Sequence, residues 1–140
     1  MADKKEELSI LKQSRTNYPE SPDEAKLETF ENPSPENNYI IELESSEFTS
    51  LCPVTSQPDY GNIIINYIPG KRCIESKSLK LYLFSYRNYQ GFAEKIINRI
   101  LNDIVRASCP KQVKVTGFFK ARGGITIKVE SNYIEEGSNK

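Results

Sequence analysis

The feature that most constrains the fold is one long apolar stripe between Gly91 and Arg106. Its members recur at helical spacing, and they are Phe92, Ile96, Ile97, Ile100, Leu101, Ile104 and Val105. Such a stripe predicts an amphipathic helix that buries one face against another element. Ala93 falls near the centre of the stripe and Glu94 at its edge. The helix is expected to end before Cys109-Pro110.

Short β-prone segments lie on both sides of this helix. Two precede it, at Tyr39–Glu44 and Gly61–Ile68, and two follow it, at Gln112–Phe119 and Ile125–Glu130. The segment Ile74–Tyr86 fits both a strand and a helix, because its apolar residues satisfy both periodicities. The order is strand, strand, one or two helices, strand, strand, which is typical of an α+β domain.

Residues 1–37 differ from the rest of the 140-residue chain in composition. They carry five basic and nine acidic side chains, a net charge of −4, and few apolar residues. We interpret them as a flexible or extended arm, most simply a solvated tail, and residues 38–140 as the folded domain. The alternative is that the arm lies across a neighbouring subunit.

Charge and hydropathy exclude several classes of protein. The 19 basic and 19 acidic residues balance, so net charge gives no sign of a nucleic acid partner. No stretch approaches the roughly 18 apolar residues of a membrane span. The N-terminus lacks the apolar run of a secretory signal, so we expect a cytoplasmic protein.

Cysteine and histidine usage restricts the chemistry further. The three cysteines include no Cys-x-x-Cys pair, and an odd count argues against a secreted disulfide scaffold. The absence of histidine excludes imidazole zinc sites and Ser-His or Cys-His nucleophilic pairs, and we expect no metal. Catalysis must therefore use Cys, Asp, Glu, Lys, Tyr or backbone groups.

Cys52 is the first candidate nucleophile. It lies on or beside a polar loop that contains two prolines, and a thiol reacts as its thiolate, which a polar environment favours. The structural alternative is a small buried apolar residue. Asp59 follows seven residues later and is either a turn residue or a carboxyl that exchanges a proton with the thiol.

Three further groups are candidate ligand contacts. Lys77 and Lys80 would share a helix face and suit phosphates, although a solvated charged face explains them equally well. Glu94 is either favoured by the helix dipole or accepts the N–H groups of a guanine-like ring. Arg122, beside two glycines, is either part of a hairpin connection or an anion contact.

Four segments together resemble one family. They are Cys52-Pro-Val-Thr-Ser-Gln-Pro-Asp59, Glu75-Ser-Lys-Ser-Leu-Lys-Leu-Tyr82, Phe84-Ser-Tyr-Arg-Asn88 and Arg122-Gly-Gly-Ile125. These segments resemble QueF, the NADPH-dependent 7-cyano-7-deazaguanine reductases of queuosine biosynthesis. The resemblance covers roughly residues 51–125, and the arm lies outside it.

The resemblance implies a fold, an assembly and a reaction. The fold is the tunnelling fold, an antiparallel four-stranded sheet with two helices inserted between its second and third strands, the first helix spanning Glu75–Tyr86. The implied assembly is a homo-oligomer, a decamer of two pentamers with active sites between subunits. The implied reaction reduces the nitrile to an amine with NADPH through a covalent cysteine thioimide.

The resemblance also implies residue roles. Cys52 and Asp59 are catalytic, as nucleophile and proton donor. The residues bordering or holding the deazaguanine are Ile74, Glu75, Ser76, Ala93 and Glu94. The expected NADPH contacts are Lys77, Lys80 and Arg122.

One position departs from the family pattern, because Ala93 stands where the family places histidine. We therefore expect the reaction at reduced rate or with altered substrate binding. The alternatives are a QueF-like amidinotransferase that acts on a tRNA-borne nitrile, and a module that binds the deazapurine without reducing it. A zinc-dependent cyclohydrolase of the same fold is disfavoured by the lack of histidine.

Overall fold

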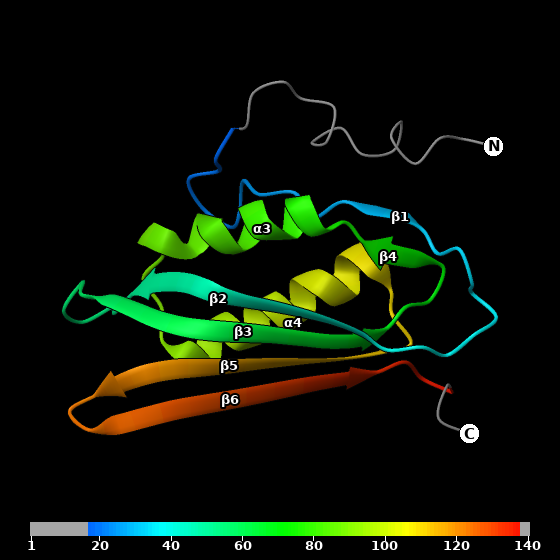
Figure 1. Cartoon of the computed structure of the whole chain (residues 1–140). Coiled ribbons are helices and arrows are strands. Elements are labelled where there is room, and N and C mark those ends of the chain that lie inside the picture. The colour runs from blue at the N-terminus through cyan, green and yellow to red at the C-terminus, as the bar shows by residue number, and fades with distance from the viewer. Residues whose placement is uncertain (1–16, 138–140) are drawn as a thin grey trace.

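The computed structural model describes residues 17–137, which contain a four-stranded antiparallel sheet and two α-helices (Figure 1). The strands, in their spatial order, are β2 (Ile41–Leu51), β3 (Pro58–Ile68), β5 (Gln112–Arg122) and β6 (Ile125–Ile134). The helices α3 (Ser76–Phe84) and α4 (Ala93–Ser108) both fall between β3 and β5. The predicted α+β class is confirmed.

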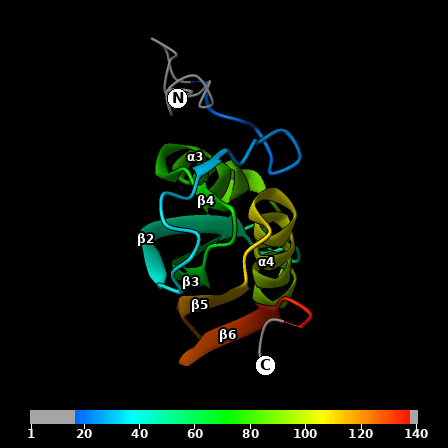
Figure 2. The same cartoon turned by 90° about the vertical axis from the view of Figure 1, so that its right-hand side faces the viewer.

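Both helices cover the same face of the sheet (Figure 2). On β3, Ile63, Ile65 and Tyr67 alternate inward and are almost fully buried, as expected for a strand with one covered face. The apolar stripe of α4 packs on β5 at Gly117, where an added Cβ would come within 2.5 Å of Ile97 Cδ1. Glycine at this position therefore lets the helix approach the sheet closely.

The predicted end of the long helix is confirmed. The C-cap of α4 is Cys109, whose φ of 47° lies in the left-handed region, and Pro110 follows. A left-handed residue and then proline are the usual stop signals for a helix. The thiol of Cys109 is exposed, whereas Cys73 is buried, and neither forms a disulfide.

The ambiguous segment Ile74–Tyr86 is mainly helical. It begins as the last residue of β4 (Arg72–Ile74), continues as α3, and ends in the 3₁₀ helix η1 (Ser85–Asn88). Glu75 is the N-cap of α3, and its carboxylate accepts hydrogen bonds from the backbone amides of Lys77 (2.8 Å) and Ser78 (2.7 Å). This cap satisfies backbone donors that a helix start otherwise leaves unpaired, and so favours the helical alternative.

Part of the predicted arm packs on the domain. The strand β1 (Thr29–Glu31) pairs antiparallel with β4. Upstream of it, Arg87 donates to the carbonyl of Pro19 at 2.9 Å. We call residues 17–31 the strap, and it runs across α3 (Figure 1). Residues 1–16 of the predicted arm lie outside the described residues.

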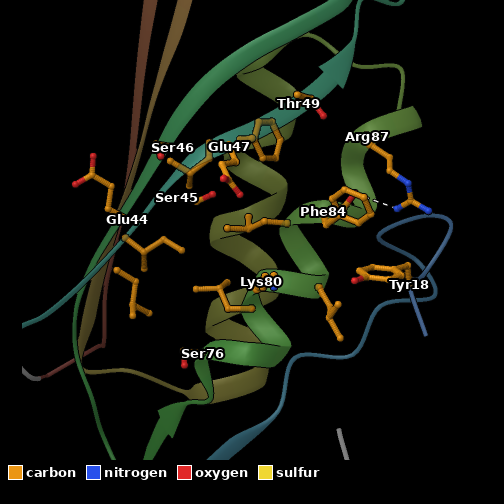
Figure 3. A pocket seen from close by; sticks show the side chains of 17 residues that line it. Tyr18, Glu44, Ser45, Ser46, Glu47, Thr49, Ser76, Lys80, Phe84 and Arg87 are labelled. Atoms are coloured by element: carbon orange, nitrogen blue, oxygen red, sulfur yellow. Dashed lines mark hydrogen bonds between the residues drawn. The ribbon is translucent and has the colours of Figure 1, made fainter. Parts of the chain in front are cut away.

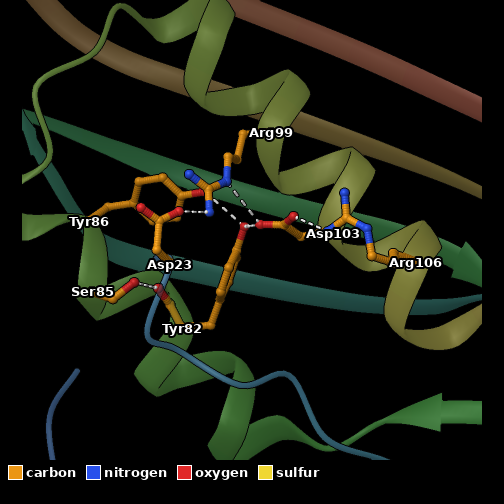
Figure 4. Close-up of polar contacts among 7 residues, drawn as sticks. All are labelled: Asp23, Tyr82, Ser85, Tyr86, Arg99, Asp103 and Arg106. Atoms are coloured by element: carbon orange, nitrogen blue, oxygen red, sulfur yellow. Dashed lines mark hydrogen bonds and ion pairs between the residues drawn. The ribbon is translucent and has the colours of Figure 1, made fainter. Parts of the chain in front are cut away.

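A partly buried polar network connects the strap with both helices (Figure 4). The Tyr82 hydroxyl donates to Asp103 Oδ2 at 2.5 Å and lies 2.8 Å from the Tyr86 hydroxyl. Arg99 contacts the same carboxylate at 3.3 Å and reaches Asp23 of the strap at 2.6 Å. Burial raises the pKa of both tyrosines, so both remain neutral donors that hold α3 against α4.

Within residues 17–137, no helix is both long and apolar enough to cross a membrane.

Candidate active site

The loop after β2 fixes the position of Cys52. Its backbone amide donates to the carbonyl of Gln57 at 2.9 Å, and the amide of Ser56 donates to the Cys52 carbonyl at 2.8 Å. Ser56 adopts a φ of 61°, a left-handed conformation that closes this turn. The loop is therefore a compact structure held by its own backbone, and Cys52 stands at its start.

The environment of Cys52 favours the thiolate. A hydrogen bond from the Thr55 hydroxyl, and then those from the backbone amides of Thr55 and Val54, lower the pKa of the thiol to about 7. Burial opposes this shift and Arg122 adds to it. Cys52 is 8% exposed and therefore buried, although it lies outside the main hydrophobic cluster of the core. The burial agrees with the structural alternative for this residue, whereas the lowered pKa is typical of a reactive cysteine.

Asp59 and Arg122 lie beside this loop. Asp59 is the second residue of β3, and its Oδ1 is 3.1 Å from Nη1 of Arg122 at the end of β5. Arg122 also donates to the side chain of Gln57 in the loop. The loop before β3 and the turn after β5 meet at the same end of the sheet (Figure 1). The structure thus brings Cys52, Asp59 and Arg122 together.

The start of α4 lies at the same end. The amide of Leu51 donates to the carbonyl of Tyr89 at 2.9 Å, and the Gln90 side chain donates to Ser56 at 3.1 Å. These contacts attach the segment before α4 to the cysteine loop. Ala93, half-buried, and Glu94, exposed, are the first two residues of α4. The ring-binding carboxylate proposed from the sequence is therefore on the cysteine side of the domain.

The other predicted substrate contacts lie elsewhere. Ile74, Glu75 and Ser76 stand where β4 meets the start of α3, at the far end of that helix from the cysteine loop (Figure 1). Ile74 and Glu75 are buried and Ser76 is exposed. One chain does not bring these residues together with Cys52. Glu75 in addition has a role that the sequence analysis did not anticipate, the capping of α3.

A groove of about 660 Å³ runs between β2 and α3 (Figure 3). Its walls are mainly apolar, and Ser76 and Lys80 of α3 line it, with Thr49 towards its other end. Lys77, half-buried, is outside the lining. The groove therefore spans from the Ser76 end of α3 towards the end of β2 that precedes Cys52.

Arg87 is a groove residue that the sequence analysis missed. It lies on η1, and its guanidinium stands 4.3 Å from the centre of the Phe84 ring. Tyr18 of the strap packs edge-on against the same ring, with centroids 5.2 Å apart. The signal in the sequence was the spacing, because Arg87 follows Lys80 by seven residues and so shares its face on a continued helix.

The donor set of the groove fits a nucleotide cofactor. Lys80 supplies a cationic donor for phosphate oxygens and Ser76 supplies a hydroxyl. The Arg87 guanidinium also lines the groove, but it already donates to the carbonyls of Pro19 and Phe84 and pairs with Glu20 at 3.4 Å. The ring of Phe84 is 45% exposed, and Arg87 and Tyr18 already pack against it. The amides at the start of α3 are already occupied by the Glu75 carboxylate, so the cations carry this recognition. Glu44 and Glu47 on β2 also line the groove.

The domain has an ionisable thiol beside a carboxylate–guanidinium pair, and a groove of nucleotide size lies on the same domain. These features define the protein as a candidate thiol-dependent enzyme. Comparison with known proteins agrees with this class. The family model of the QueF-like proteins matches residues 58–138. The chain belongs to the QueF-like protein family.

Three relatives with the same curated name match between 76% and 99% of the chain. An NADPH-dependent 7-cyano-7-deazaguanine reductase of Bacteroides fragilis is 46% identical over 99% of this chain and 91% of its own length. The enzyme of the same name from Helicobacter pylori is 59% identical over 76% of this chain and 72% of its own length. The enzyme of the same name from Streptococcus mutans is 49% identical over 91% of this chain and 78% of its own length.

A solved structure supports the fold. The crystal structure of the archaeosine synthase QueF-Like in the apo form matches 69% of this chain and 94% of that chain with a TM-score of 0.64. At 23% sequence identity this likeness concerns the fold alone.

Proposed function

We propose that this chain reduces the nitrile of 7-cyano-7-deazaguanine to the aminomethyl group of 7-aminomethyl-7-deazaguanine, with NADPH as reductant, in the queuosine modification of tRNA. The observation that carries the proposal is the Cys52 thiol of lowered pKa beside Asp59 and Arg122. Relatives named for this reaction, at 46–59% identity, support it.

Cys52 is the nucleophile of the proposed reaction. With a pKa of about 7, about half of its thiol is ionised at neutral pH. A nitrile accepts hydride poorly, and addition of the thiolate converts it to a thioimide, which is a better electrophile. The covalent bond also holds the substrate carbon in one place for the steps that follow.

Asp59 carries the proton of this addition. It takes the thiol proton and delivers it to the nitrile nitrogen, so that the sulfur–carbon bond forms as one carbon–nitrogen π bond breaks. Its carboxylate is held by Arg122 at 3.1 Å, on the strand next to the cysteine loop. NADPH supplies one hydride for each of two reductions, and the Cys52 thiolate is released between them.

Recognition of the ring is shared between chains in this proposal. Glu94, at the cysteine end, accepts the N–H edge of the deazaguanine, and Ala93 leaves space beside it. Ile74, Glu75 and Ser76 border the ring from a neighbouring subunit, because they lie at the other end of α3. We therefore infer a homo-oligomer of tunnelling-fold subunits, a decamer of two pentamers.

The sheet edges support such an assembly. Among the described residues, β2 and β6 are the outer strands of the sheet, and each has one edge without a partner strand. The two strands are 11 and 10 residues long, and apart from Leu51, which pairs with the segment before α4, their outer edges expose backbone donors and acceptors that another chain can satisfy. The cofactor would lie in the groove with its phosphates on Lys80 and Arg87, and with Lys77 at its margin.

Cellular location belongs to the same proposal. The three cysteines are free thiols, and a reactive thiol that works with NADPH suits the reducing cytoplasm.

A spectrophotometric titration tests the function. Addition of 7-cyano-7-deazaguanine to the wild-type oligomer is expected to produce a thioimide absorbance band, and NADPH is expected to bleach it as NADPH is oxidised. The Cys52→Ala variant should show neither change, whereas Cys109→Ala, at an exposed cysteine on the far end of α4, should match the wild type. Absence of both band and NADPH oxidation in the wild type would contradict the proposal.

The alternative from the sequence analysis is the amidinotransferase reaction. It predicts that ammonia and a nitrile-bearing tRNA give an amidine without NADPH. A third outcome, a stable band that NADPH does not bleach, would indicate a binding module. The cationic groove favours the reductase over both, because neither alternative needs a nucleotide cofactor.

A further inference from the structure

Two arginines from different elements hold the first part of the strap on the domain. Arg87 of η1 donates to the Pro19 carbonyl at 2.9 Å and pairs with Glu20 at 3.4 Å. Arg99 of α4 pairs with Asp23 at 2.6 Å. The strap is therefore fixed at two neighbouring points, one on each of these arginines.

The Arg99 contact lies outside the groove between β2 and α3. Asp103 also contacts the Arg99 guanidinium, at 3.3 Å, and Pro22, the strap residue before Asp23, is buried (Figure 4). Neither Arg99 nor Asp23 belongs to the lining of the groove. A ligand that enters the groove therefore leaves this anchor of the strap in place.

The Arg87 contact, in contrast, is part of the groove. Tyr18, Phe84 and Arg87 all line it, and they lie together at one end (Figure 3). Tyr18 packs edge-on against the Phe84 ring, and the Arg87 guanidinium stands 4.3 Å from the centre of the same ring. The strap thus forms the wall at this end, and it does so through a cation that the proposed function assigns to the cofactor phosphates.

The ion pair between Glu20 and Arg87 is suited to exchange. The Glu20 side chain is 73% exposed, and an ion pair of this kind contributes little to stability. A forked contact of a guanidinium with a phosphate uses Nη2 and one neighbouring nitrogen, and Nη2 is the atom that pairs with Glu20. A phosphate on Arg87 also repels the Glu20 carboxylate, because both are negative.

We propose that residues 17–21 form a flap at one end of the groove, and that the phosphate-bearing cofactor opens this flap by taking Arg87 from Glu20. The flap moves away from Phe84 while the contact between Asp23 and Arg99 persists. In the closed state Glu20 offsets the charge of Arg87, so the groove binds the cofactor less tightly. This inference rests on the proposed function and adds a control of cofactor entry to it.

Binding of NADP+ to the oligomer, measured by calorimetry without the nitrile, tests the competition. We expect Glu20→Gln to lower the Kd about threefold, the size of one exposed ion pair. Glu24→Gln removes the same charge from a strap residue that is exposed and outside the groove lining, and it should match the wild type. Arg87→Gln should raise the Kd about tenfold, the loss of one charged hydrogen bond.

A double-mutant cycle and a protease show whether the two residues act together. In an Arg87→Gln background, Glu20→Gln should change the Kd no further. A glutamyl endopeptidase cuts after Glu20, within the flap, and after Glu24, beyond the Asp23 anchor. NADP+ should speed the first cut about threefold relative to the second, in line with the loss of one ion pair. Arg87→Gln should show the faster first cut without NADP+.

The outcomes separate the flap from the function on which it rests. If the wild type neither binds NADP+ nor oxidises NADPH with the nitrile, the proposed function fails and the flap with it. If it oxidises NADPH, but Glu20→Gln binds NADP+ no more tightly than Glu24→Gln, the function stands and the flap is wrong. A raised Kd in Glu20→Gln, or a slower cut after Glu20 with NADP+, would mean that the strap holds the cofactor, which also overturns the inference.

Discussion

Thr55 is the single residue on which the reactivity of Cys52 depends most. Its hydroxyl makes the largest contribution to the lowered pKa of the thiol. The residue is exposed and its hydroxyl also accepts the Gln57 amide at 3.3 Å, so it belongs to the loop rather than to the core. The sequence analysis noted a polar surrounding for Cys52 but did not identify this donor.

Removal of the Thr55 hydroxyl should move the reactivity of Cys52 to higher pH. In the wild type we expect the alkylation rate by iodoacetamide to reach half its maximum near pH 7 and to fall as the pH drops further, because the thiolate is protonated. In Thr55→Ala the half-maximum should lie closer to the ordinary thiol value. Thr55→Ser, which keeps the hydroxyl, is the control, and identical profiles for all three would contradict the assignment.

Position 93 offers a test of substrate recognition. Ala93 is the half-buried first residue of α4, next to Glu94, and the family pattern has histidine there. Ala93→His adds a donor where the deazaguanine edge is expected, so the KM for the nitrile should fall while the KM for NADPH stays constant. Steady-state kinetics with each substrate varied separately measures this. A rise in both KM values would indicate that the side chain does not fit.

Sequence motifs identified Cys52 and Asp59, because these residues lie close together in the chain. They did not identify the partner of Asp59, since Arg122 arrives from the end of another strand and only the sheet brings it near. Arg122 was expected at the cofactor. Tertiary contacts of this kind carry no local signal, and so only the structure shows them.

At the scale of secondary structure, α3 illustrates where pattern alone fails. Leu79, Leu81 and Leu83 are all buried, although a helix with one covered face would hide fewer of them. The reason is that α3 lies between the sheet and the strap and is covered on more than one side. The alternating leucines that suggested a strand are a consequence of this burial on more than one side of the helix. By contrast, the stripe of α4 predicted its buried face correctly from Ile96 onwards, but Phe92 was wrongly included, because it is the N-cap and is 57% exposed.

The Glu75 cap is expected to contribute to stability. Glu75→Ala removes both acceptors of the Lys77 and Ser78 amides, and the free energy of unfolding should fall by about 0.5–2 kcal/mol. Glu75→Gln keeps one acceptor oxygen and should lose less. Urea unfolding followed by circular dichroism measures both. If Glu75→Ala unfolds like the wild type yet binds no nitrile substrate, the side chain acts on the ligand alone.

At the scale of the whole molecule, the two ends of α3 carry different parts of the proposed site. Cys52, Asp59 and Glu94 lie at one end, and Ile74 and Ser76 at the other. A single chain therefore has an incomplete site if the roles implied by the family hold. The sequence indicated a site shared between subunits only through the family resemblance, because no pattern of residues shows how two copies of the chain pack together.

Dilution of the enzyme tests this division. If the site is shared, specific activity should fall with dilution in step with dissociation measured by analytical ultracentrifugation. Alkylation of Cys52 should persist in the dissociated chains, because the loop that lowers its pKa is formed within one chain. Full activity in a monomer fraction would show that the site is complete in one subunit.

The end of α4 has a practical consequence for chemical labelling. Cys109 presents an exposed thiol in a left-handed conformation that suits glycine better than any side chain. A maleimide fluorophore would therefore react at two places, and the signal from the loop would be mixed with that from the helix end. Cys109→Gly removes the second label and relaxes the backbone at the same position, which leaves the Cys52 thiol, whose pKa is lowered, as the anchor for a probe.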